Sequence, residues 1–123
     1  MLKWPDASRV ESALERWVAE VLSQRDDVVR IGCFGSYARG DWGVGSDLEL
    51  VVVVERSDLP FERRSARWDT SRLPVPADLL VYTEAEWARL SSERPFHQAL
   101  LRQARWLYSR DRGTAGDKPA VEP

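Results

Sequence analysis

The feature that most constrains the fold is the unbroken apolar run LVVVV at residues 50–54, which directly follows the polar sequence DLE. The run is shorter than a helix normally is, and far shorter than the stretch that spans a membrane. Short runs rich in β-branched residues are typical of a strand that is buried on both faces. We therefore expect a sheet with this segment as a central strand and with helices covering its two faces.

The regions on either side of this strand alternate between helical and strand patterns. Apolar residues recur at helical spacing over residues 9–24, and Ser8 with Glu11 predicts a capping box at the start of that helix. Runs rich in β-forming residues predict further strands at residues 28–34, 77–82 and 104–108, the last as an edge strand.

Shorter helices are predicted in the second half of the chain. Residues 61–70 predict a short helix with three arginines facing solvent, Arg63, Arg64 and Arg67. Thr83 and Glu86 form a second capping box, and Pro95 suits the first turn of a helix that continues to about residue 103. The order of elements predicts an α/β fold (α+β by some schemes), with a small mixed β-sheet flanked by helices.

Length and composition set the remaining limits. The 123 residues fit one domain, predicted over residues 1–110, and residues 111–123 have lost most apolar side chains and predict a disordered tail. The formal net charge of -2 argues against direct binding of a nucleic-acid backbone. The single cysteine, Cys33, forms no internal disulfide and indicates a reducing cytoplasm; it is predicted to be a core residue.

A turn that suits phosphate follows the predicted strand 28–34. Gly35 and Ser36 are placed where a short helix opens, so free backbone N–H groups point outward beside the Ser36 hydroxyl. Arg39 could contact a phosphate from the same segment, or form an ion pair with Asp41. Taken alone, a Gly-Ser turn is also an ordinary helix start, so this segment does not establish a site.

Three carboxylates add a second kind of group. Asp47 and Glu49 flank Leu48 at the head of the central strand and project from one face. Asp78 lies near the start of the strand predicted at residues 77–82. If these strands are adjacent, the three acids form a cluster of oxygen ligands, which suits Mg²⁺ or Mn²⁺. The pair Asp47 and Glu49 by itself is equally consistent with a solvated strand end.

These residues together resemble the polymerase-β-type nucleotidyltransferase superfamily. The string GSYARGDWGVGSDLEL is similar to the pattern GSxARG…SDxDL, and Asp78 matches the third acid. The nearest likeness is to the minimal nucleotidyltransferase (MNT) domains, which are antitoxin-like. Glu49 departs from the pattern, because most close relatives have Asp there, and catalysis is sensitive to such small displacements of a carboxylate.

The resemblance implies a polymerase-β-like fold and a metal-dependent transfer of a nucleoside monophosphate, AMP from ATP, to an acceptor hydroxyl. Two Mg²⁺ or Mn²⁺ ions are implied, with Asp47, Glu49 and Asp78 as metal-binding and catalytic residues. Gly35 and Ser36 would hold the triphosphate, with Arg39 beside them. The implied partner is a small helical HEPN-type protein, a toxin that presents a tyrosine as acceptor.

Two alternatives stay open from the sequence. The chain could be a non-catalytic module that binds nucleotide or metal and neutralises a partner by contact. It could also be a transferase that acts on a small molecule or a nucleic acid together with a partner subunit. Two further residues are interpreted as structural: His97 as a plain helix residue away from the acids, and Trp42 as loop packing or a partner contact rather than a base-stacking ring.

Overall fold

The computed structural model describes residues 5–40, 43 and 45–110. The predicted tail 111–123, the stacking role weighed for Trp42 and the ion pair weighed for Asp41 lie outside these residues.

The four predicted strands form one mixed sheet. Its spatial order is β3-β2-β1-β4, and the strands are β1 (Val28–Phe34), β2 (Leu48–Val54), β3 (Ala77–Thr83) and β4 (Arg105–Ser109). Strand β2 runs parallel to β3 and antiparallel to β1, and β4 is antiparallel to β1. The prediction of a small mixed sheet with β2 as a central strand is confirmed, and each strand lies within about one residue of its predicted bounds.

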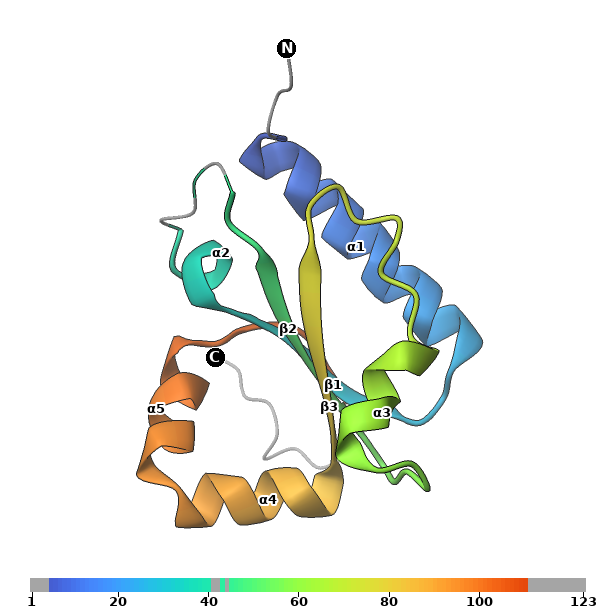
Figure 1. The fold of residues 1–123 in the computed structure, drawn as a ribbon, viewed down its shortest axis with the longest axis vertical. Coiled ribbons are helices and arrows are strands. Elements are labelled where there is room, and N and C mark those ends of the chain that lie inside the picture. Colours follow the sequence, from blue (N-terminus) through green and yellow to red (C-terminus); the bar gives the residue numbers. More distant parts are fainter. Residues whose placement is uncertain (1–4, 41–42, 44, 111–123) are drawn as a thin grey trace.

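The helices lie on both sides of this sheet (Figure 1). They are α1 (Ala7–Gln24), α2 (Gly35–Arg39), α3 (Phe61–Arg64), α4 (Glu84–Glu93) and α5 (Pro95–Gln103), and a 3₁₀ turn, η1 (Ser65–Arg67), follows α3. Within the described residues, no helix has the length and apolar character needed to cross a bilayer.

Helix α1 covers one face of the sheet. Its apolar stripe, with Val10, Leu14 and Trp17 buried, packs on alternate residues of the central strands such as Leu50 and Val52. These side chains are almost fully removed from water, which is the main source of stability in a domain of this size. This face is therefore closed.

Aromatic side chains fill part of the opposite face, which lies toward α4 and α5. Phe34, Val51, Val53 and Trp87 form a second buried cluster, with Trp106 packed against it. A Cβ atom at Gly32 would lie 2.7 Å from the Trp106 ring, so glycine at this strand position lets the indole lie across β1.

Two helix starts can be compared with their predictions. The box at Thr83 and Glu86 is confirmed: the Thr83 hydroxyl accepts from the Glu86 N–H, and the Glu86 carboxylate accepts from the Thr83 N–H. The box at Ser8 and Glu11 is wrong. Helix α1 begins earlier, with Asp6 as N-cap accepting from the Arg9 N–H, because Asp is at least as good an N-cap as Ser.

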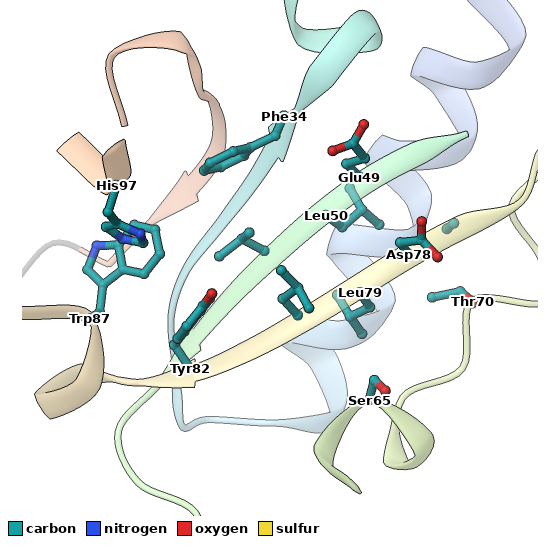
Figure 2. A pocket seen from close by; sticks show the side chains of 13 residues that line it. Phe34, Glu49, Leu50, Ser65, Thr70, Asp78, Leu79, Tyr82, Trp87 and His97 are labelled. Carbon is teal, nitrogen blue, oxygen red and sulfur yellow. The ribbon is translucent and has the colours of Figure 1, made fainter. Parts of the chain in front are cut away.

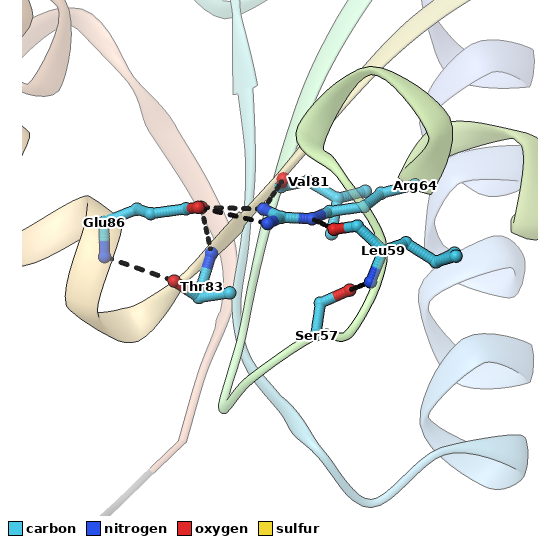
Figure 3. A network of polar contacts seen from close by, with 6 residues as sticks. All are labelled: Ser57, Leu59, Arg64, Val81, Thr83 and Glu86. Carbon is cyan, nitrogen blue, oxygen red and sulfur yellow. Dashed lines mark hydrogen bonds and ion pairs between the residues drawn. The ribbon is translucent and has the colours of Figure 1, made fainter.

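The predicted exposure of Arg64 is also wrong. Its side chain is 8% exposed and forms two hydrogen bonds to the Glu86 carboxylate, of 2.7 and 3.1 Å. It also donates to the carbonyl oxygens of Leu59 and Val81 (Figure 3). Helix α3 is only one turn long, and the Arg64 side chain at its end turns inward and joins α3, β3 and α4. Arg63 and Arg67 are exposed, as predicted.

Candidate functional site

Two of the predicted acids lie side by side on neighbouring strands. Glu49 of β2 pairs in register with Asp78 of parallel strand β3, and on its other side it pairs with Phe34 of β1. Paired residues of adjacent strands project to the same face. Both residues are exposed, Glu49 at the start of β2 and Asp78 at the start of β3.

The Glu49 carboxylate lies against the backbone of Gly35. A Cβ atom built on Gly35 would be 2.9 Å from Glu49 Cδ and closer still to Oε2. Gly35 also has φ 74°, a left-handed conformation that side chains disfavour. Both the close contact with Glu49 and the positive φ therefore favour glycine at position 35. This contact joins the first residue of α2 to the start of β2.

A cavity of about 590 Å³ extends from these carboxylates along the open face (Figure 2). Glu49 and Asp78 line one end, with Phe34 beside Glu49, and Tyr82, Trp87 and His97 line the other. Ser65 and Thr70 line the cavity beyond β3. No Lys or Arg side chain is among its described lining residues. The cavity is large enough for a drug-sized or nucleotide-sized ligand.

The geometry only partly provides for a divalent cation. Glu49 and Asp78 are oxygen donors of the kind that Mg²⁺ and Mn²⁺ take. The missing side chain at Gly35 leaves room for the Glu49 carboxylate. Among the described residues, however, no three acidic, histidine or cysteine side chains form a group that could hold a metal ion. Asp47 precedes the first residue of β2, so no strand pairing holds it beside the other two. The three-carboxylate site stays a prediction.

The remaining predicted site residues lie on α2. The short helix opens at Gly35 as predicted, after Phe34, and its first turn has no side-chain cap. Ser36 is half-buried, and Arg39 is exposed in the last turn. Neither lines the 590 Å³ cavity, so a role in holding phosphate stays a prediction for both.

His97 belongs to the aromatic end of the cavity, which the sequence did not indicate. It is buried, lies 4.4 Å from Trp87 between ring centroids, and lines the same cavity as Glu49 and Asp78. Its Nε2 atom is buried without a hydrogen-bond partner in the described structure. Burial lowers the pKa of His97, so the neutral ring is favoured. The packing of α5 on α4 brings it there, which periodicity within one helix cannot show.

The aromatic end of the cavity was missed by the sequence interpretation. Tyr82 lies four residues after Asp78 on β3, and strand alternation could have placed it on the same face. Burial raises the pKa of Tyr82, and the Glu86 charge adds to this, so the phenol keeps its proton.

Burial likewise raises the pKa of the Cys33 thiol to about 11, and its assignment as a core residue is confirmed.

The proteins that this chain is similar to are nucleotidyltransferases by description. The family model described as a nucleotidyltransferase domain matches residues 15–100. A solved structure of a nucleotidyltransferase candidate from Sulfolobus solfataricus matches with a TM-score of 0.62 and 21% sequence identity, over 87% of this chain and 86% of that one. At this identity the likeness concerns the fold. Comparison with curated proteins returned no significant match.

Proposed function

This chain belongs to the nucleotidyltransferase domain family of the polymerase-β-type superfamily, and from that premise we propose that it transfers AMP from ATP to an acceptor hydroxyl. The single observation that carries the proposal is the placement of Glu49 beside Asp78 and against Gly35, at the mouth of a large cavity. Family membership supports nucleotidyl transfer in general, and the choice of ATP rests on the resemblance to minimal nucleotidyltransferase domains.

The proposed reaction is an in-line displacement at the α-phosphorus. The acceptor oxygen forms a bond to this phosphorus while the bond to the pyrophosphate oxygen breaks, and pyrophosphate leaves. Mg²⁺ or Mn²⁺, when bound, would neutralise the charge that develops on the phosphate oxygens. Glu49 and Asp78 would hold the ions together with Asp47. Asp78 would also take the proton of the attacking hydroxyl.

The described cavity favours an acceptor that carries no phosphate chain. Its described lining holds two carboxylates, several aromatic rings and no Lys or Arg, whereas nucleic-acid sites are rich in these two residues. Leu80, 44% exposed, adds apolar surface beside Tyr82. This composition suits a hydroxyl on an apolar or aromatic group, and we propose the tyrosine of a HEPN-type protein partner as that acceptor.

The test is incubation of the protein with labelled ATP and Mg²⁺ or Mn²⁺, with and without protein fractions from the same cell. We expect label on a protein acceptor and release of pyrophosphate, both lost in Glu49→Ala and Asp78→Asn. Glu49→Asp should keep activity or raise it, since it restores the commoner acid. Asp58→Asn, an exposed acid that lies outside the cavity lining, is the matched control and should behave like the parent.

The other outcomes separate the alternatives. Label on RNA or on a small molecule would contradict the protein acceptor but keep the transferase. If the parent transfers nothing and Glu49→Ala and Asp78→Asn still neutralise a partner, the chain is a binding module. Melting curves with Mn²⁺ and a non-hydrolysable ATP analogue add a readout that does not need turnover, because stabilisation follows occupancy of the site.

A further inference from the structure

A second cavity, of about 170 Å³, lies away from the carboxylates and is unusual in its charge. Four arginines line it, Arg25, Arg56, Arg64 and Arg67, together with Ser57 and Trp68. No acidic side chain is among its described lining residues. The whole chain has a formal net charge of -2, so this concentration of positive charge is local rather than a consequence of a basic protein.

Two of these arginines are held in place by the fold. Arg25 donates two hydrogen bonds to Asp27, of 3.0 and 2.9 Å, and its guanidinium lies 4.3 Å from the Trp68 ring centroid. Arg64 is fixed by Glu86 and two carbonyl oxygens, as Figure 3 shows. A guanidinium carries five N–H donors, so these bonds leave donors on both groups. Arginines fixed in this way cost little further entropy when a ligand binds.

The other two arginines supply the unbalanced charge. Arg56 and Arg67 are exposed, and within the described part of the chain neither forms an ion pair with a carboxylate. Like charges around one cavity repel each other unless an anion lies between them. We propose that this cavity binds the phosphate group of a small ligand, held by the guanidinium groups of Arg56 and Arg67 with Arg25 and Arg64 behind them.

Size and surroundings favour one phosphate over a nucleic-acid backbone. At about 170 Å³ the cavity is much smaller than the 590 Å³ cavity beside the carboxylates, and this size suits a single tetrahedral oxyanion. The neighbouring cavity of about 320 Å³ shares Arg25, Arg67 and Trp68, and its lining also includes Glu20, Asp69 and Arg72. Arg72 forms an ion pair with Glu20, so Asp69 is the carboxylate whose charge would repel a second phosphate that followed the first along a chain.

The cavity is separate from the nucleotidyltransferase site. The segment from α3 to η1 lies between them, because Ser65 lines the 590 Å³ cavity while Arg64 and Arg67 line this one. Binding here therefore does not depend on the activity proposed above.

The test is calorimetric titration of the full chain with inorganic phosphate and, separately, with methyl phosphate, at an ionic strength held constant with chloride. We expect saturable binding that Arg56→Gln/Arg67→Gln weakens at least about tenfold, because charge-assisted hydrogen bonds are lost. Arg63→Gln is the control for a single lost charge: like a change at Arg67, it removes one arginine from the segment of α3 and η1, is exposed, and does not line the cavity. Its affinity should equal that of the parent.

Several results would overturn the proposal. These are the absence of saturable binding in the parent, an equal loss in Arg63→Gln, or unchanged binding in the double variant. Binding of single-stranded RNA that depends on Arg56 and Arg67, without binding of either phosphate ligand, would assign the cavity to nucleic acid instead. Tighter binding of methyl phosphate than of inorganic phosphate supports the site and indicates a phosphomonoester as its ligand.

Discussion

The two faces of the sheet use the same strands for different purposes. On the α1 side, residues 48, 50, 52 and 54 of β2 are at most 1% exposed, and α1 closes the face. On the other side, exposure falls along β2, from exposed Glu49 to Val51 and Val53, which the aromatic cluster covers. The incomplete cover leaves the cavity and the two carboxylates open. The face covered by α1 therefore contributes most of the stability. The groups that could bind a ligand lie at one end of the opposite face.

The same substitution on the two faces tests this contrast with the largest effect. Leu14→Ala removes a side chain that is 1% exposed on the closed face, and we expect a loss of about 2–5 kcal/mol in the free energy of unfolding. Leu80→Ala removes a side chain that is 44% exposed beside the cavity and should cost less than about 1 kcal/mol. Denaturant unfolding curves measure both. Equal losses would show that Leu80 is packed as tightly as Leu14, and would contradict the contrast between the two faces.

The junction between α3, β3 and α4 should be the next most sensitive region. Arg64→Ala removes the arginine donors from the Val81 carbonyl and from the Glu86 carboxylate, which keeps only the Thr83 N–H, and we expect a loss of about 3 kcal/mol in unfolding free energy. Arg63→Ala, on the exposed side of the same helix, should stay within about 0.5 kcal/mol of the parent.

The same pair predicts a pH dependence with a definite sign. The hydrogen bonds from Arg64, together with smaller contributions from Thr83, lower the pKa of Glu86 from 4.5 to about 2. The stabilisation is therefore fully present above pH 4.5 and is lost as the pH falls toward 2. The share of this acid destabilisation that is due to Arg64 should disappear in Arg64→Ala, and only the smaller share due to Thr83 should remain. If the parent and the variant lose stability alike below pH 4.5, the ion pair does not contribute as proposed.

A smaller effect is expected where α2 meets β2. Gly35→Ala forces an alanine into φ 74° and moves the Glu49 carboxylate, at a cost of about 1–2 kcal/mol. Adding Glu49→Ala should recover only the part due to the carboxylate, since the backbone conformation is unchanged. A double-mutant cycle of unfolding free energies separates the two parts. A purely additive result would contradict the contact between these residues.

The smallest effect concerns His97 on the open face. Because burial lowers its pKa below the ordinary 6.5, protonation favours the unfolded chain, and stability should begin to fall as the pH drops below that value. His97→Phe keeps a ring beside Trp87 and removes the titration. Between about pH 7.5 and 5.5, the melting temperature of the parent should therefore fall more than that of the variant. Parallel falls would exclude His97 as the titrating group.

Local patterns were enough for most of the fold. The apolar run of β2, the helical spacing of α1 and the capping box at Thr83 each depend on interactions between residues near in sequence, and the structure agrees with them. The start of α1 at Asp6 shows the limit of such signals, because two good N-cap residues lay within one turn. For the candidate site, strand alternation was enough to expect Glu49 and Asp78 on one face once β2 and β3 are neighbours.

By itself, the sequence determined the mixed sheet, its central strand and membership of the nucleotidyltransferase family, since these follow from periodicity and a local motif. Only the tertiary structure decided that Arg64 turns inward, that His97 lies in the cavity of Glu49 and Asp78, and that four arginines surround a second cavity. The reason is that these positions depend on how α3, α4 and α5 pack against the sheet. Such packing joins residues far apart in the chain, and it is selected by the total free energy of the fold rather than by any local pattern.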